Sequence, residues 1–350
     1  MLHICLGPNF FEPSQLKVNI LTIMHELGHA LGFNSISLAH FRRHEDGTPY
    51  TARDQNGQVI LQDNVECTGP QHLQPHQTRR MNKVPLPSEQ VLQFRTVRGG
   101  VRVAEIVTPS VRQVVRNHFD CQTLSGAELE SGEFLPLPLT STATTKGNGS
   151  AANDDDDSFN NNNNNTAVAC IGDHWERRLF KSDLMNPIVD GLEFNPRFST
   201  ITLAYFADSG WYQVDLSRAS LAASWGRGAG CAFVEETCLT NGQVPPNYDA
   251  FFCNQAPNMI SGGSFSTDIH GCTPDLTHKA VCSLGQYRGA LPLEYQYFNE
   301  TFVGGSDPFM DYCPVYAGFA NGLCADQQNA AAIQVNRMER FGQRNSRCLS

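Results

Sequence analysis

Long apolar segments are the first thing that this 350-residue sequence lacks, since no hydrophobic run approaches the roughly 20 residues of a transmembrane helix. Charged residues are also scarce, at 17%, and their balance is acidic, with a formal net charge of -10. An acidic chain has little with which to neutralise phosphates, which excludes nucleic acid as an expected partner. The first residues, "MLHICLGPNFFEPS", lack the basic start and apolar core of a signal peptide, and the last, "RNSRCLS", lack the hydrophobic tail of a lipid anchor.

Paired C-x-x-C motifs, which mark zinc ribbons, are missing as well, although the chain has 12 cysteines. Most of the cysteines lie in the last third of the chain at irregular spacings, and such a pattern favours disulfides over metal ligands. Disulfides form in oxidising compartments, so we expect an extracellular or cell-surface protein. We therefore also expect that the complete protein carries an N-terminal extension ahead of Met1.

Aliphatic residues other than alanine are absent between residues 140 and 166, where an acidic run precedes an asparagine tract. Such a segment cannot bury enough apolar surface to offset the entropy that it would lose on folding. We interpret it as a disordered insertion in the surrounding domain. A helix is expected soon before it, at Pro109–Phe119, because valines and a phenylalanine recur there on one side.

One further expected helix carries a zinc-protease signature. Apolar residues recur at helical spacing over residues 14–31, and Gly32 is a typical helix stop. Within this segment His25, Glu26 and His29 form the motif H-E-x-x-H. Residues four apart share one helix face, so both imidazoles can bind one zinc ion while the glutamate reaches the water on the metal.

The third zinc ligand is less obvious. The extended protease pattern places a histidine three residues after the glycine, where this chain has Ser35. His40 and His44 follow closely, but they lie in a polar stretch and are expected on the surface. His174 differs, because it follows the insertion, precedes a tryptophan and lies 11 residues before Met185, which an Asn-Pro turn follows. In metzincin proteases a methionine in such a turn lies beneath the zinc. The other histidines that come into consideration are His72, His76, His118, His270 and His278.

Five segments resemble the leishmanolysin family of metzincin zinc metallopeptidases, and they occur in the same order along nearly the whole chain. They are "MHELGHALGF", "FRRHEDGTPYTARD", "IVTPSVRQVVRNHFDCQTLSGAELE", "HWERRLFKSDLM" and "GSDPFMDYCPVYAGFANGLC". In that family a long insertion separates the helix motif from the third histidine, which lies in an H-W-E context before L-M. The resemblance implies that His25, His29 and His174 bind one zinc ion per chain. It also implies that Glu26 is the general base and Met185 the Met-turn residue.

The resemblance also suggests disulfide pairs. By order and spacing within the family these are Cys121 with Cys231, Cys238 with Cys313, and Cys253 with Cys282. Cys5 and Cys324 are expected to have partners beyond the two ends of this chain. Family members place a signal peptide, a pro-segment and a twisted sheet ahead of the active-site helix, so the chain resembles an N-terminally truncated member.

The expected fold class is α+β. A metzincin (zincin-like) core would contribute the active-site helix and the Met-turn, and a disulfide-rich, mainly β domain would follow. We expect residues 1–32 to be the remnant of the N-terminal catalytic subdomain and residues 33–225 to form a central domain with the third zinc ligand. Residues 226–350 would then form the Cys-rich C-terminal domain.

The leading function hypothesis is a zinc-dependent endopeptidase that hydrolyses extracellular or cell-surface proteins and peptides. The family allows membrane association, although this chain shows no anchor of its own. The alternative is a catalytically impaired homologue that acts as a Cys-rich adhesion or binding protein. A third hypothesis, a gluzincin protease with a glutamate as the third ligand, is disfavoured by Gly32 and Met185.

Three acidic residues are secondary candidates. Glu128 and Glu130 in "GAELE" resemble a solvated acidic loop more than a calcium site. Asp173, beside His174, is a candidate hydrogen-bond acceptor for a zinc ligand.

Overall fold

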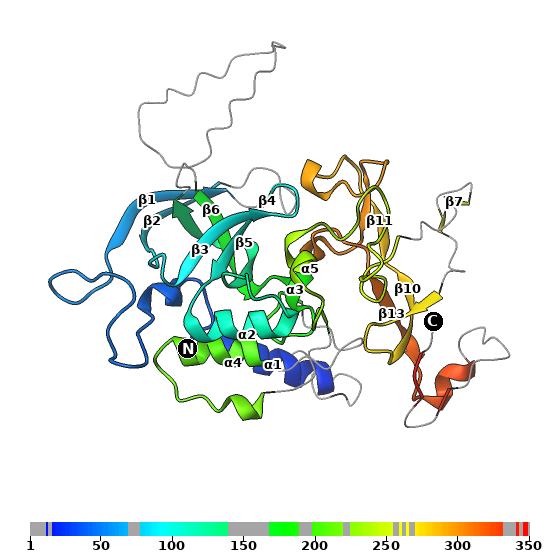
Figure 1. Cartoon of the computed structure of the whole chain (residues 1–350), viewed down its shortest axis with the longest axis horizontal. Helices are drawn as coiled ribbons and strands as arrows, with labels where there is room; N and C mark the ends of the chain where they lie inside the picture. Colours follow the sequence, from blue (N-terminus) through cyan, green and yellow to red (C-terminus); the bar gives the residue numbers. More distant parts are fainter. Residues whose placement is uncertain are drawn as a thin grey trace, which may run out of the picture.

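The computed structural model describes residues 12, 16–68, 78–138, 168–188, 198–219, 225–254, 259–260, 264–265, 270–331, 341–342 and 346–348 (Figure 1). The insertion expected at 140–166 and Cys5 lie outside the described residues. Helices and a sheet are both present, so the mixed helix and sheet content of the predicted α+β class is confirmed. Among the described residues, no helix is both long and apolar enough to cross a membrane.

A six-stranded sheet forms the upper layer in Figure 1. Its strands are β1 (Leu61–Thr68), β2 (Thr78–Pro85), β3 (Leu92–Val97), β4 (Val101–Ile106), β5 (Ala127–Pro138) and β6 (Val168–Trp175), in the order β2-β1-β6-β5-β4-β3. All neighbouring pairs are antiparallel except β1 and β6, which are parallel. The sheet therefore brings β5 and β6 to its middle, although the long insertion separates them in sequence.

The long helices lie below the sheet: α1 (Leu16–Ala30), α2 (Pro109–Phe119) and α4 (Thr200–Asp208) (Figure 1). α2 has the predicted bounds, and it buries Val111, Val115 and Phe119 on one face, as their spacing predicts. α1 ends one residue before its expected end, and the chain turns at Gly32 with a φ of 108°. A side chain at that position would be strained and would also meet the Trp211 ring at 2.7 Å.

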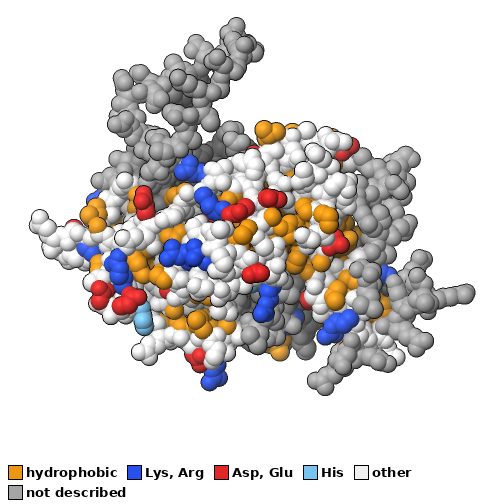
Figure 2. Space-filling view, viewed as in Figure 1, with side chains coloured by type: hydrophobic (Ala, Val, Ile, Leu, Met, Phe, Trp, Pro, Cys, Tyr) orange, Lys and Arg blue, Asp and Glu red, His pale blue; other side chains and the backbone are white. Residues whose placement is uncertain are grey.

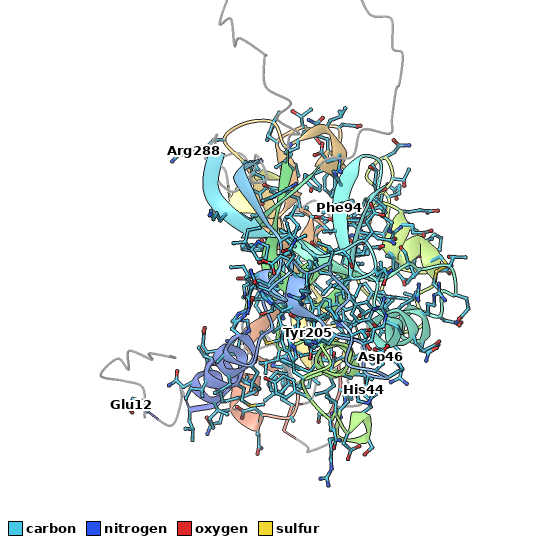
Figure 3. All side chains as sticks on the ribbon, turned by 90° about the vertical axis from the view of Figure 1, so that its left-hand side faces the viewer. Glu12, His44, Asp46, Phe94, Tyr205 and Arg288 are labelled. Carbon is cyan, nitrogen blue, oxygen red and sulfur yellow. A yellow bond between two sulfur atoms is a disulfide. The ribbon has the colours of Figure 1, made fainter. Side chains whose placement is uncertain are left out.

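Tyr205 of α4 connects these helices to the interior, where Figure 3 places it. Its hydroxyl donates to the Gly32 carbonyl at 2.7 Å, so it holds the end of α1. Its ring packs against Phe33, Phe41 and Trp175. By contrast, His44 lies at the periphery in the same view and is exposed, as predicted for a surface residue.

The remaining elements of the described residues are short and are joined by loops. The helices are α3 (Arg177–Phe180) and α5 (Cys231–Glu235), and the short 3-10 helices are η1 (Ile36–His40), η2 (Leu216–Arg218), η3 (Leu293–Tyr295), η4 (Pro308–Met310) and η5 (Gln327–Ala331). The strands are β7 (Met259–Ile260), β8 (Ser264–Phe265), β9 (His270–Cys272), β10 (His278–Cys282), β11 (Leu284–Gln286), β12 (Val303–Gly305) and β13 (Tyr316–Leu323).

Disulfides cross-link the Cys-rich part and tie it to the end of α2. Among the described residues the bonds are Cys121–Cys231, Cys238–Cys313, Cys253–Cys282 and Cys272–Cys348. The first three have the pairing that the resemblance suggests, and Cys272–Cys348 was not anticipated. Cys324 is a buried free thiol.

One continuous hydrophobic cluster, whose buried members range from Phe33 to Val315, includes residues of the sheet, the helices and the Cys-rich part. The division at residues 32 and 225 therefore stays a prediction. On the face shown in Figure 2, acidic, basic and hydrophobic side chains of the described residues are interspersed.

Candidate metal centre

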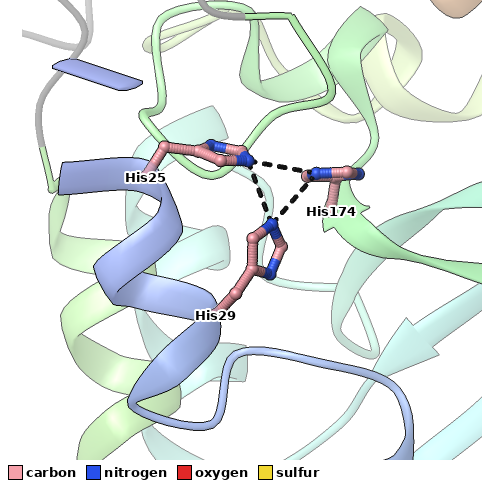
Figure 4. Close-up of side chains that lie close together, drawn as sticks. All are labelled: His25, His29 and His174. Carbon is pink, nitrogen blue, oxygen red and sulfur yellow. Dashed lines mark hydrogen bonds between the residues drawn. The ribbon is translucent and has the colours of Figure 1, made fainter. Parts of the chain in front are cut away.

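Three histidine side chains converge between α1 and β6. His25 and His29 lie one helical turn apart on α1, and His174 is the penultimate residue of β6 (Figure 4). Their Nε2 atoms are 3.0 Å apart for His25 and His29, 3.2 Å for His25 and His174, and 3.3 Å for His29 and His174. The i, i+4 spacing on the helix thus places two rings together, and the sheet supplies the third.

Each of these rings is oriented by a hydrogen bond at its other nitrogen. Nδ1 of His25 lies 2.7 Å from the Leu184 carbonyl, and Nδ1 of His29 lies 2.7 Å from the Phe33 carbonyl. Nδ1 of His174 lies 2.6 Å from Oε1 of Glu130. A carbonyl or carboxylate oxygen can only accept, so each Nδ1 donates, and a neutral ring then has its lone pair on Nε2.

Electrostatics favours a cation among these nitrogens. Three lone pairs facing one another at close range repel unless a positive charge lies between them. Burial lowers the pKa of His25, although its bond to the Leu184 carbonyl opposes this effect; His29 and His174 nearby lower the pKa further. A ring with a lowered pKa stays neutral and keeps its Nε2 lone pair for a metal.

The distances between the nitrogens agree with a metal site. Two nitrogens bound to one tetrahedral zinc ion at about 2.0–2.1 Å lie about 3.3 Å apart, close to the separations that these rings show. The three histidines could hold a metal ion, and their donor atoms all lie within 4.8 Å of one another. The donor set and its spacing therefore fit zinc.

A buried turn packs against the helix that carries His25 and His29. Met185 is fully buried, and its side chain lies against Gly28, where any added Cβ would collide with the Met185 sulfur. The neighbouring residue, Leu184, supplies the carbonyl that orients His25. The backbone N–H of Trp175 donates to the Met185 carbonyl at 2.9 Å, which ties this turn to the end of β6. The glycine in H-E-L-G-H thus admits the methionine between helix and turn.

Two of the secondary predictions from the sequence are wrong. Asp173 does not accept from His174; it accepts from the backbone N–H and the hydroxyl of Ser35, at 2.7 and 2.6 Å. Successive side chains of a strand point to opposite faces, so Asp173 points to Ser35 while His174 points to the other histidines. Ser35, which occupies the position of the missing histidine, therefore connects the segment after α1 to β6.

"GAELE" is not a solvated loop, because it begins β5 and its acidic side chains are buried. Glu130 is the acceptor for His174, and Glu128 binds Arg98 instead of a calcium ion. Glu130 was missed because the bond spans 44 residues and depends on the pairing of two strands. The only local signal was the pair of acidic residues at strand spacing.

The remaining predicted residues lie as follows. Glu26 is half-buried on α1, between the two helix histidines in sequence. His40 and His44 are exposed, as predicted. His118 bonds to the Trp225 carbonyl and His278 to Thr277, so both have other partners. The glutamate ligand of the gluzincin hypothesis would occupy the place that His174 takes in this fold.

Comparison with known proteins gives a consistent result. The sequence model of the leishmanolysin family matches residues 161–350. The chain is 32% identical over 326 residues to the leishmanolysin-like peptidase of Drosophila melanogaster, covering 88% of this chain and 39% of the relative. It is 28% identical over 314 residues to that of Caenorhabditis elegans, covering 85% and 39%. With the leishmanolysin of Leishmania tropica it shares 35% identity over 178 residues, covering 51% of this chain and 24% of that protein. The chain thus spans about two fifths of the length of the leishmanolysin-like relatives.

Proposed function

This chain belongs to the leishmanolysin family of metallopeptidases, and from that premise we propose that it is the zinc-binding part of an endopeptidase that cleaves extracellular or cell-surface proteins. The observation that carries the proposal is the meeting of three Nε2 atoms within 3.3 Å, each on a ring whose Nδ1 is already engaged. Random histidine clusters have no reason to share such an orientation.

In this proposal His25, His29 and His174 hold one zinc ion, in a core of the metzincin type. Bound there, zinc would supply Lewis-acid activation of a water molecule and of the peptide carbonyl. Met185 is the Met-turn residue, and its buried side chain, which packs against Gly28 of α1, would form the apolar floor of the centre. Leu184, next to it, orients His25 through its carbonyl.

Glu26 is the general base. It follows a ligand directly on the same helix and is half-buried, so it stays close to the centre without being sealed from solvent. It takes the proton that the attacking water gives up and then delivers it to the leaving amine nitrogen. This role requires a carboxylate at this position, since an amide cannot accept the proton.

The disulfides support an extracellular or cell-surface location, since four cross-links fit an oxidising compartment. The adhesion alternative has less support. A binding protein with an inert core would not need three rings oriented toward one point, whereas a peptidase does. Membrane association stays a proposal taken from the resemblance alone.

Two substitutions in the full-length protein test this function. Glu26→Gln should keep about one zinc ion per chain and lose peptide hydrolysis by roughly 100- to 10,000-fold, because the base is lost and the ligands are not. His174→Ala should lose both zinc and hydrolysis. Metal analysis and cleavage of an unstructured protein substrate, with and without a chelator, measure both effects.

Matched controls come from the exposed loop after η1. Glu45→Gln and His44→Ala make the same chemical changes at exposed positions and should behave as the parent protein. Hydrolysis at the parent rate by Glu26→Gln, or retention of zinc by His174→Ala, would contradict the assigned roles.

A further inference from the structure

The three histidines differ in the group that orients them. Two donate to backbone carbonyls, which are neutral, whereas His174 donates to the Glu130 carboxylate at 2.6 Å. Glu130 lies on β5 and is only 8% exposed. Hydrogen bonds to a charged acceptor are about twice as strong as neutral ones, so the ring from the sheet is held more tightly than the rings from the helix.

A bulge in the sheet creates this contact. β5 and β6 pair Leu129 with Trp175 and Ser131 with Ile171. One residue of β5, Glu130, therefore faces three residues of β6, from Gly172 to His174. Bulges bend a strand and redirect its side chains, and they are common next to active sites.

Gly172 is the residue that makes room for the carboxylate. A Cβ at this position would collide with Oε1, Cγ and Cδ of Glu130. Its φ is not in the left-handed region, so the requirement for glycine at this point is space rather than backbone conformation. The lack of a side chain at Gly172 thus allows the Glu130 carboxylate to lie against β6.

Glu130 also has an oxygen that no described group satisfies. Oε2 is buried and has no hydrogen-bond partner. A buried carboxylate that lacks bonds is costly unless positive charge lies close by. A dication on His174 would provide that charge through the imidazole.

We propose that Glu130 is the positioning residue of the third zinc ligand, an inference that rests on the function proposed above. Its carboxylate keeps His174 in the Nδ1–H form, makes Nε2 a stronger donor and offsets part of the zinc charge. Gly172 and the bulge give the carboxylate its place. Loss of such an outer partner typically weakens metal affinity 10- to 100-fold.

The test uses Glu130→Gln and Glu130→Ala in the full-length protein, with Glu89→Gln on the surface as the matched control. Zinc affinity is measured by competition with a chelator, and the absorption spectrum is recorded with Co²⁺ in place of zinc. Glu130→Gln should weaken zinc binding about 10-fold, and Glu130→Ala about 100-fold. Both should shift the Co²⁺ spectrum, because a ligand changes in strength and orientation. At saturating zinc, kcat for a peptide substrate should fall, whereas KM should change by no more than about twofold.

Gly172→Ala gives a second, independent arm. It displaces the carboxylate without removing it, so it should weaken zinc binding about as much as Glu130→Ala. The double variant of Gly172→Ala and Glu130→Ala should bind zinc no more weakly than either single variant, because both changes remove the same contact.

The outcomes separate the two proposals. A parent protein that binds no zinc overturns the proposed function and this inference with it. A parent that binds zinc, with Glu130→Gln and Glu130→Ala of unchanged affinity and Co²⁺ spectrum, overturns the role of Glu130 alone. Additive losses in the double variant also overturn it. Glu130→Gln has nearly the size of the parent residue, so it keeps the test open if Glu130→Ala fails to fold.

Discussion

Asp183 is a single buried carboxylate that holds the turn around Met185. It accepts from the Met185 backbone N–H at 2.6 Å, from the Thr202 hydroxyl at 2.9 Å and from the Ser199 hydroxyl. Burial raises its pKa from 3.8 to about 6, although these hydrogen bonds oppose the rise. A change in the protonation of Asp183 with pH therefore acts directly on the turn that contains Met185.

The stability of the protein should carry a pH dependence from Asp183. Above pH 6 the group is charged in both states, and the folded state bears the cost of burying the charge. As the pH falls from about 6 to 3.8, the folded protein binds a proton that the unfolded chain does not yet bind. Stability from this group is therefore greatest below pH 3.8 and is lost as the pH rises through 6, by about 3 kcal/mol in all.

Asp183→Asn should remove this contribution. Denaturant unfolding of both proteins between pH 4 and 7.5, with a chelator present, should show that the free energy of unfolding of the parent rises relative to that of the variant as the pH falls. The exposed Asp46, whose pKa is lowered mainly by hydrogen bonds from Thr48, should show the opposite sign in Asp46→Asn. Parallel stability curves for the parent and Asp183→Asn would refute the prediction.

At the scale of elements, α2 begins at a carboxylate supplied by another helix. Oδ2 of Asp208, the last residue of α4, accepts from the backbone N–H groups of Ser110 and Val111 at 2.8 and 3.0 Å. The residue before the helix, Thr108, makes no such side-chain bond. Asp208 thus satisfies the free N–H groups at the start of α2 and places a negative charge at the positive end of its dipole.

Asp208→Ala should destabilise the protein by about 1–2 kcal/mol, because the N–H groups of Ser110 and Val111 lose their acceptor and the dipole loses its charge. Asp208→Asn should cost less, since an amide oxygen can still accept. Asp215→Ala is the matched control, because Asp215 caps only the exposed η2. Unfolding in urea measures all three, and equal midpoints for Asp208→Ala and Asp215→Ala would exclude the capping role.

The elements differ in how well the sequence predicts them. The bounds of α2 follow from its apolar spacing and its proline at the first turn, which are local signals. Its cap does not, because Asp208 lies 97 residues from Val111. The same holds at the centre: H-E-x-x-H places two rings by local geometry, and the resemblance indicated His174. Glu130 depends on a strand register and a bulge that no local pattern specifies.

At the scale of the whole molecule, Arg98 joins the sheet to the Cys-rich part. It is 1% exposed and lies in the turn between β3 and β4, with a φ of 46°. Its guanidinium binds both oxygens of Glu128 on β5, at 3.0 and 2.8 Å, and Oδ2 of Asp311 after η4 at 2.9 Å. It also donates to the Val234 carbonyl of α5 at 3.0 Å.

Charge balance explains why these groups are found together. Burial would lower the pKa of Arg98, but Glu128 and Asp311 raise it well above its ordinary value. Arg98 and Asp311 are 213 residues apart, so no sequence window contains both. The disulfide Cys238–Cys313 connects the segment just after α5 to the segment that carries Asp311, which keeps the acidic partner near the arginine.

Arg98→Ala should therefore lower the free energy of unfolding by roughly 3–5 kcal/mol, because two buried carboxylates lose their cation. Arg218→Ala, which breaks an exposed pair with Asp215, should cost less than about 1 kcal/mol. Adding Glu128→Gln to Arg98→Ala should recover part of the loss, since it removes a buried charge that would keep only the longer contact to Arg95, at 3.5 Å. Denaturant unfolding with the disulfides intact measures the free energy of unfolding of Arg98→Ala, Arg218→Ala, Glu128→Gln and the double variant. The buried ion pair does not join the sheet to the Cys-rich part as described if Arg98→Ala costs no more stability than Arg218→Ala. The same conclusion follows if the losses of Arg98→Ala and Glu128→Gln simply add in the double variant.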